Sequence, residues 1–540
     1  MSAIVATLAN TAWWLANEPA YARFKGALAS PRRAQEQLLC SYLRQHTNTA
    51  FGRDHTFSEI DSAAAFRRNI PIRNYDDLSP YIDRIAAGEA NVLTSHRVVG
   101  LATSSGSTRA RKLIPYTREL QREFKRAIGP WIVDLFRGDP ELARGCAYWS
   151  ITPVAQREGE APAEPFARSD EDASAGASPS NTPRIGFEAD SAYLGGVVQW
   201  LVDAAMAVPS HMRHVPNIED FRRETMRHLL KRRDLRLISV WHPSFLELLL
   251  DSVGSINVRE VWPNLRLISC WADAHARAPA EALAMRFPGV RIQPKGLLAT
   301  EAFVTIPFAG HWPLAIRSHF FEFADDREEV RLADDLRLGA EYSVVVTTAG
   351  GLWRYRLGDR VRVEGFVDAT PSLRFVGRED RVVDRFGEKL SEGFVGQAIR
   401  ETLVRCNTTA TFSMLAPQRC DDGFRYTLFV ETGHEIDVKL ADRLDARLRA
   451  NPHYDYCRSL GQLLPPNVFV IRGRAFPKYV EELRRTGQRL GDIKPAALSD
   501  RMTWGSVFDG GYFAGCGSPH HLRVNQNNDV VNHTLRSTDE

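Results

Sequence analysis

The sequence predicts an α/β protein with a large N-terminal domain of β-sheets flanked by helices and a smaller α+β C-terminal domain. Its 540 residues are too many for one hydrophobic core. Helical and strand patterns alternate from Tyr193 onward, which is typical of parallel strands joined by helices. Beyond Gly377 this pattern gives way to a different mixture of strands and helices. We therefore expect domains at residues 1–376 and 377–540, joined by a hinge near residues 377–389.

Each element is predicted from the spacing of its apolar residues. In the N-terminal part we expect helices over residues 3–15, 31–47, 78–87 and 117–136, and a buried strand over 146–152. The alternating region should contain helices at 221–231 and 245–251 and strands at 235–240, 265–270, 344–348 and 361–366. In the smaller domain we expect strands at 411–415, 424–430 and 468–471 and helices at 399–406 and 436–450.

Residues 154–183 differ from the rest of the chain. Glu, Ala, Pro and Ser dominate this stretch, and Asp170, Glu171 and Asp172 form an acidic cluster. Such a composition lacks the apolar residues needed to form a core. We expect an exposed, disordered insertion whose deletion is tolerated.

The composition excludes several classes of protein. The 69 basic and 66 acidic residues give a net charge of only +3, which does not favour nucleic acid as a partner. The seven cysteines are scattered and never form a CxxC pair, which argues against a disulfide framework or a zinc site. We find no run of 18 apolar residues that could cross a membrane. A reducing cytoplasm fits this composition best.

The stretch from Thr103 to Lys112 has a composition suited to binding phosphate. It lies between two apolar segments, so we expect a loop that joins a strand to a helix. Backbone N–H groups, hydroxyls and cations can converge on an anion in such a loop. The residues concerned are Ser104, Ser105, Gly106, Ser107 and Thr108. A polar surface turn would have the same composition, and the GxxxxGK[ST] pattern of P-loop NTPases is absent.

Four further segments carry residues suited to nucleotide chemistry. Thr300 and Glu301 end a Gly-containing stretch, where the carboxylate could hold Mg²⁺ or simply be solvated. The turn-rich segment 350–359 ends in Asp359, which could accept hydrogen bonds from a ribose or form an Asx turn. The charged junction over residues 375–389 contains Arg378 and Lys389, and the loop 487–495 presents Lys494 between Gly and Pro.

The order of these segments resembles that of the GH3 family of auxin-responsive acyl acid amido synthetases, within the superfamily of adenylate-forming enzymes. The most specific similarity is the stretch Gly-Leu-Trp-Arg-Tyr-Arg-Leu-Gly-Asp at residues 351–359. The stretches 451–454 and 476–479 are similar to the family's C-terminal landmarks, and 487–494 to its loop with a mobile lysine. The resemblance covers nearly the whole chain.

The resemblance implies a ligase with two half-reactions. A small carboxylic acid attacks ATP to give an acyl adenylate and pyrophosphate, and the amine of an amino acid then takes the acyl group. By similarity, Ser104, Ser105, Ser107 and Thr108 would contact the phosphates, and Gly106 and Thr300 would also belong to the nucleotide site. Glu301 would bind the Mg²⁺, Asp359 the ribose, and Arg378 the ribose or phosphate. Lys389 and Lys494 would reach the nucleotide from a mobile smaller domain, Lys494 stabilising charge during adenylation. The implied cofactors are ATP and Mg²⁺.

Two residues depart from the family pattern, and two other functions stay open. Arg109 stands where glycine is common, and Leu297 stands where an aromatic residue often packs on adenine. An acyl-CoA or acyl-carrier ligase would share the first half-reaction, and a catalytically silent binding protein is the other alternative. A serine hydrolase is disfavoured because no GxSxG motif is present. Candidates for the acyl pocket are Tyr193, Gln199, Trp200, Trp241 and His242. The sequence does not identify the acid, the amine or the oligomeric state.

Overall fold

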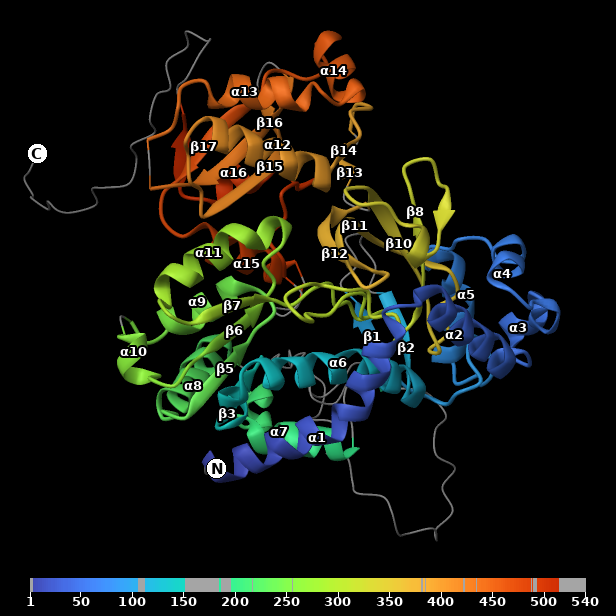
Figure 1. Ribbon diagram of the computed structural model, residues 1–540. Coiled ribbons are helices and arrows are strands. Elements are labelled where there is room, and N and C mark those ends of the chain that lie inside the picture. The colour runs from blue at the N-terminus through green and yellow to red at the C-terminus, as the bar shows by residue number, and fades with distance from the viewer. Residues whose placement is uncertain are drawn as a thin grey trace, which may run out of the picture.

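The computed structural model describes residues 3–104, 112–150, 184–185 and 196–513, except 216, 255, 380, 381, 384, 421, 422, 434, 487 and 489–492. Within this part of the chain, two regions of mixed helix and sheet lie one above the other (Figure 1). The predicted insertion, Arg109 and Tyr193 lie outside the described residues. No described helix is long and apolar enough to cross a membrane.

A parallel four-stranded sheet forms the first layer of the large N-terminal region. Its strand order is β3-β5-β6-β7, with β3 at Cys146–Trp149, β5 at Leu235–Ser239, β6 at Leu267–Cys270 and β7 at Arg291–Pro294. Figure 1 shows α8, α9 and α11 on one side of this sheet and α1, α6 and α7 on the other. These helices span Ala3–Ala27 (α1), Arg118–Gly138 (α6), Gly196–Ala205 (α7), Ile218–Leu230 (α8), Pro243–Asp251 (α9) and Arg277–Arg286 (α11), with the short α10 at Val258–Val261. The predicted α/β layer with parallel strands is confirmed.

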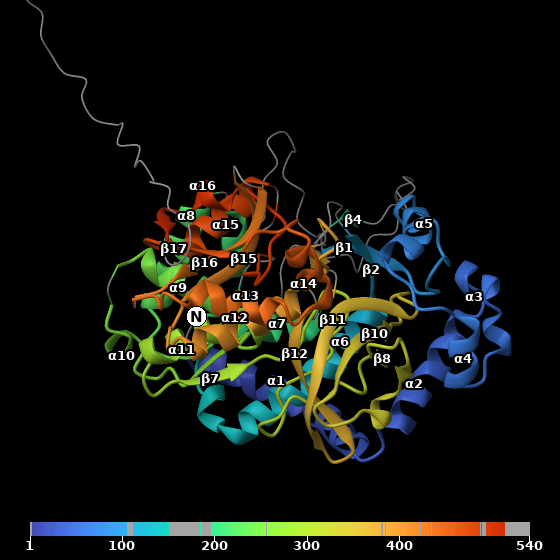
Figure 2. The ribbon, with the colours of Figure 1, turned by 90° about the horizontal axis from the view of Figure 1, so that it is seen from above.

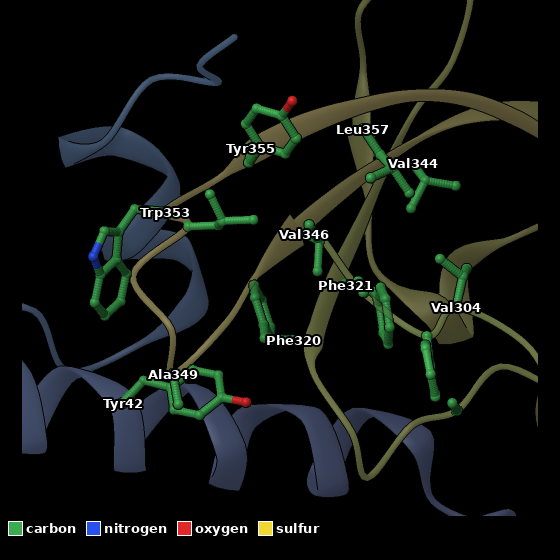
Figure 3. Packing of buried hydrophobic residues seen from close by; sticks show 14 of the residues in the cluster. Tyr42, Val304, Phe320, Phe321, Val344, Val346, Ala349, Trp353, Tyr355 and Leu357 are labelled. Carbon is green, nitrogen blue, oxygen red and sulfur yellow. The ribbon is translucent and has the colours of Figure 1, made fainter. Parts of the chain in front are cut away.

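An antiparallel five-stranded sheet lies beside this layer. Its order is β12-β11-β10-β8-β9. The strands span Phe320–Ala324 (β8), Val330–Arg331 (β9), Glu341–Thr347 (β10), Tyr355–Val367 (β11) and Thr370–Arg378 (β12). Helices α2 (Pro31–His46), α3 (Ala50–Asp54), α4 (Ala63–Asn69) and α5 (Tyr75–Ala86) share a hydrophobic core with it. Figure 3 shows part of this core, with Phe320 and Val346 of the sheet together with Trp353 and Tyr42.

The smaller C-terminal region is built on a four-stranded sheet of order β15-β16-β17-β18. Its strands span Phe412–Cys420 (β15), Gly423–Glu431 (β16), Asn467–Ile471 (β17) and Gly510–Tyr512 (β18). One hydrophobic cluster joins it to α12 (Glu392–Arg405), α13 (Leu440–Leu448) and α14 (Pro452–Ser459), and another to α15 (Ala475–Arg485) and α16 (Trp504–Val507). The short strands β13 (Val382–Val383) and β14 (Leu390–Ser391) precede α12. Figure 2 shows this region lying over the large one.

The segment around the hydroxyl loop corrects one prediction. Strand β1 (Val98–Ser104) pairs antiparallel with β2 (Lys112–Thr117), so the loop joins two strands and not a strand to a helix. The reason is the apolar run after the loop, in which Ile114 and Tyr116 are fully buried against the core. Helix α6 begins only afterwards, where the Thr117 hydroxyl accepts a hydrogen bond from Leu120 N at 3.1 Å. Strand β4 (Arg184–Ile185) completes this sheet.

The segment 350–359 corrects a second prediction. Only its first half is a turn, because residues from Tyr355 onward belong to strand β11 and pair with β10 and β12. Every second side chain here is buried, namely those of Tyr355, Leu357 and Asp359, and this is the period of a half-buried strand. The acid at the end of this segment therefore lies on a strand and not on a glycine turn.

Candidate functional site

A cleft of about 970 Å³ lies between the two regions of the chain. The large region contributes the loop after β6, the stretch after β7 and the ends of β11 and β12. The smaller region contributes α12, the start of α15 and the loop between α15 and α16. Ligands in open α/β sheets bind beyond the carboxyl ends of the parallel strands, which is where β6 and β7 meet this cleft. The cleft therefore has the position expected of a substrate site.

Lys494 extends from the smaller region into this cleft. Its Nζ lies 4.2 Å from the ring centroid of Trp271, the first residue after β6. A lysine ammonium over an indole face is attracted to the ring and loses part of its hydration. The backbone carbonyl of Lys494 accepts a hydrogen bond from the Tyr479 hydroxyl at 3.0 Å, which ties the loop to α15. The sequence-predicted lysine thus lies at the large region in this structure.

Two further contacts hold the two regions together beside Lys494. His242 stacks on Phe476 of α15 with ring centroids 5.4 Å apart, and Arg474 forms a two-point ion pair with Asp251 of α9, one of whose contacts is 2.9 Å. Burial, and next the charge of Lys494, lower the pKa of His242 to about 3, so this imidazole is neutral. The interface is therefore partly aromatic and partly ionic.

Asp359 and Arg378 face the same cleft from the antiparallel sheet. They are direct cross-strand partners on β11 and β12, and the Oδ1 and Nη1 atoms lie 3.5 Å apart. Asp359 is buried, with 4% of its surface exposed, while the Arg378 side chain keeps 24% exposed. The structure thus brings Asp359, Arg378 and Lys494 together at one cleft, although their positions in the sequence are far apart.

The turn before Asp359 is fixed by buried polar contacts. The Arg354 guanidinium binds both oxygens of the Glu322 carboxylate, at 2.8 and 3.0 Å, and also donates to the Ile70 carbonyl. Trp353 Nε1 donates to the Leu93 carbonyl at 2.9 Å. Gly351 has a φ of +105°, and a Cβ there would come within 2.6 Å of the Leu93 Cβ. Only glycine therefore fits at this point of the turn.

A buried carboxylate links this turn to the segment that carries Glu301. Glu123 of α6 accepts hydrogen bonds from Ala349 N, at 3.2 Å, and from the Tyr42 hydroxyl. Arg126 Nη2 lies 3.8 Å from this carboxylate and His319 Nδ1 lies 3.3 Å from it, while His319 Nε2 accepts a hydrogen bond from Phe303 N. Because Nε2 is an acceptor, the ring proton is on Nδ1, the ring nitrogen nearer to the carboxylate. One network therefore orders the turn at residue 349 and the backbone just after Glu301.

Glu301 itself is buried, with 7% of its surface exposed, so it is not a solvated surface glutamate. Its turn is closed by a hydrogen bond of 2.9 Å from Ala299 N to the Ala302 carbonyl, and Thr300 lies within it. Neither residue is among those that line the cleft, whereas Leu297 is. Lys389 is also absent from the lining, because it is exposed beside α14, where its carbonyl accepts from Asn451 Nδ2.

Several of the predicted site residues belong to the hydroxyl loop or to the candidate acyl pocket. Ser105, Gly106, Ser107 and Thr108 lie outside the described residues, and only the backbone of Ser104 is described. Of the acyl-pocket candidates, Trp200 is 67% exposed on α7 and His242 packs at the interface, while nothing is described of the Gln199 side chain. The Lys295 Nζ lies over the ring of Trp241, 4.5 Å from its centroid.

Sequence reasoning missed the loop that follows β6. Trp271 and Asp273 both line the cleft, and Arg277 follows one turn later at the start of α11. Nothing in their spacing forms a recognisable motif. The signal that could have indicated them is position alone, because a loop at the carboxyl end of a predicted parallel strand faces the ligand.

The arrangement of the two regions around the cleft is the fold of adenylate-forming ligases. It superimposes on an acyl acid amido synthetase described as AtGH3.15 in complex with 2,4-DB, with a TM-score of 0.77 and 16% identity over 92% of this chain and 96% of that one. It also superimposes on 2-hydroxyisobutyryl-CoA ligase in the postadenylation state, with a TM-score of 0.52 and 11% identity over 88% and 91% of the two chains.

The chain belongs to the GH3 family. The family's N-terminal domain model matches residues 20–172, its central domain model 312–378 and its C-terminal domain model 394–502, which together cover more than half of the chain. Among its relatives, indole-3-acetic acid-amido synthetase GH3.2 of Arabidopsis thaliana is 22% identical over 75% of this chain and 84% of the relative. GH3.17 of the same plant, of the same named activity, is 25% identical over 66% and 70%.

Proposed function

We propose that this chain is an ATP-dependent acyl acid amido synthetase. It adenylates a small carboxylic acid with release of pyrophosphate, and then transfers the acyl group to the amine of an amino acid. The observation that carries this proposal is the meeting of Asp359, Arg378 and Lys494 at one cleft, in a chain of the GH3 family. The scattered cysteines, six of which are described and unbridged, favour a reducing cytoplasm as its location.

The residues at the cleft suit the adenylation step. A carboxylate that attacks a polyphosphate needs its negative charges neutralised more than it needs an enzyme nucleophile. Lys494 and Arg378 supply cations, Asp359 can accept hydrogen bonds from the ribose, and the hydroxyl loop after Ser104 can bind phosphate oxygens. The buried Glu301 carboxylate has the chemistry of a Mg²⁺ ligand, and a bound Mg²⁺ would neutralise phosphate charge. Lys389 would need a domain movement to take part.

The experiment that tests this proposal separates the two half-reactions. Exchange of labelled pyrophosphate into ATP, measured against a panel of carboxylic acids, identifies the acid that is adenylated. Amino acids are then added to the best acid, and the amide product is identified by mass spectrometry. Absence of exchange with every acid would contradict the proposal.

An acyl-CoA ligase is the second candidate, because the fold is shared with 2-hydroxyisobutyryl-CoA ligase. Both kinds of enzyme would carry out the same exchange, so exchange cannot separate them. A competition assay separates them: CoA and an amino acid are added in equal amounts to the enzyme that holds the acyl adenylate. Formation of an acyl-CoA thioester in place of the amide would show that the chain is an acyl-CoA ligase.

A further inference from the structure

We propose that the loop between β6 and α11 binds the acceptor amino acid, with Asp273 taking the proton that the ammonium group loses and Arg277 holding the carboxylate. The proposal rests on the proposed function and adds to it a site for the second substrate. Both residues line the cleft, on the wall that also carries Trp271 and its Lys494 contact. They were not indicated by any sequence motif.

The geometry of the loop places the two charges side by side. Asp273 precedes a 3-10 turn (Ala274–Ala276), and Arg277 is the next residue and the first of α11. Ala276 N donates to the Asp273 carbonyl at 2.9 Å, which closes this turn. A carboxylate and a guanidinium therefore lie about one helical turn apart on the wall of the cleft. An amino acid zwitterion presents the opposite charges at a similarly short separation.

The surroundings of Asp273 keep its carboxylate able to accept a proton. Its side chain is 15% exposed, and its nearest cation is Arg374 of β12, whose Nη1 lies 3.7 Å away. Arg374 is shared, because its Nε lies only 2.7 Å from Glu364 of β11. Burial above all, together with the charge of Glu364, raises the pKa of Asp273 to about 6, although Arg374, Arg277 and the Phe375 backbone N–H act to lower it.

A second cation faces this wall from the smaller region. Arg400 of α12 lines the same cleft, and its pKa is lowered by partial burial and next by the charge of Arg277. Two guanidinium groups that repel one another across a cleft gain stability when an anion binds between them. The carboxylate of the acceptor is such an anion. The acceptor would then contact both regions.

The proton balance of the transfer step follows from this arrangement. The acceptor ammonium gives one proton to Asp273 and becomes a neutral amine. Its nitrogen attacks the acyl carbonyl, the C–N bond forms, and the C–O bond to the phosphate breaks with its electron pair leaving on AMP. The second nitrogen proton passes to water as the tetrahedral intermediate collapses. Asp273 returns its proton to solvent after the product leaves.

The test compares acceptors that need these groups with acceptors that do not. Asp273→Asn should keep acid-dependent pyrophosphate exchange and lose amide formation with amino acids by about 100-fold or more. Hydroxylamine is neutral at neutral pH and needs no base, so hydroxamate formation should be retained. The wild-type transfer rate should fall as pH drops through about 6, and the variant should lack this inflection.

Arg277→Ala gives an independent second test. It should raise KM for the amino acid by about tenfold and leave KM for an amine without a carboxylate unchanged. Glu224→Gln and Arg227→Ala, which change an exposed ion pair of α8 outside the cleft lining, serve as controls and should leave both values unchanged.

Each contrary outcome has a definite meaning. If the Asp273→Asn variant transfers the acyl group to amino acids at the wild-type rate, the proposal is overturned. It is also overturned if the folded variant loses pyrophosphate exchange, because Asp273 would then act at the nucleotide. An equal loss of the transfer rate with hydroxylamine and with amino acids would also overturn the proposal, because hydroxylamine needs no base. Absence of exchange in the wild type would instead contradict the proposed function itself.

Discussion

Asp359 and Arg378 occupy directly opposed positions on β11 and β12, with their charged atoms 3.5 Å apart at the edge of the cleft. The pair is formed by strand register, which fixes both side chains on the same face of the sheet. It lines the same cleft as Lys494, so the five-stranded sheet and the smaller region share one site.

We expect Glu301→Gln to keep its fold and lose acid-dependent pyrophosphate exchange by roughly 100- to 1,000-fold. The carboxylate is buried in an ordered turn, and the amide has the same shape but cannot neutralise a cation. Exchange is measured over a range of Mg²⁺ concentrations, with thermal unfolding as the check on folding. Wild-type exchange at every Mg²⁺ concentration would remove Glu301 from the site.

Lys494→Ala should slow the formation of acyl adenylate by roughly 100-fold and spare the second half-reaction. The ammonium can stabilise phosphate charge only while the smaller region holds it at the cleft, a hinge movement of a familiar kind. Transfer from chemically supplied acyl adenylate to the amine should proceed at a near-normal rate.

The matched control for Lys494 is Lys478→Ala, which removes a lysine of α15 whose partner is Asp509. It should leave both half-reactions intact. Equal damage to the two half-reactions in Lys494→Ala would rule out the movement, and damage to neither would show that this lysine is only a loop residue.

Replacement of residues 154–183 by a short Gly/Ser linker should leave activity and melting temperature unchanged. The stretch is rich in Pro, Ala, Ser and acidic residues, which cannot supply a packed core. Steady-state amide formation is the measurement. A large rise in KM for the acid would show that the segment covers the acyl pocket.

Arg354→Ala should destabilise the protein by about 3–5 kcal/mol, because it removes the two-point partner of the buried Glu322 carboxylate and leaves only Arg67, whose Nε lies 3.7 Å away. Urea unfolding at several pH values measures this. Burial already raises the pKa of Glu322, and loss of Arg354 raises it further. A folded-state pKa above the unfolded value penalises folding at high pH, so the loss of stability should shrink as pH falls and Glu322 becomes protonated.

Arg356→Ala is the control for that measurement. Its ion pair with Glu328 is solvent-accessible, with 28% of the arginine side chain and 65% of the glutamate side chain exposed. Exposed pairs contribute less than about 1 kcal/mol. Equal losses in the two variants would mean that the burial of Glu322 does not decide the effect.

Much of the fold follows from the sequence. The apolar periods predicted the parallel strands β3, β5 and β6 and the long helix α6 within a few residues, because those patterns are local and strong. The motifs that carry Glu301, Asp359 and Lys494 were also visible, since each combines charged residues with glycine or small residues in a short stretch. The sequence therefore determined the class of the protein and the chemistry available to it.

Tertiary structure decided which of these residues meet. Strand pairing, and not local pattern, turned the hydroxyl loop into a hairpin connection and put Asp359 on β11 opposite Arg378. The packing of the smaller region on the large one brought Lys494 to Trp271 while leaving Lys389 exposed. Asp273 and Arg277 carry no motif, because their significance comes only from the cleft wall on which the ends of β6 and α11 place them. Such contacts join residues far apart in the chain, so no local pattern encodes them.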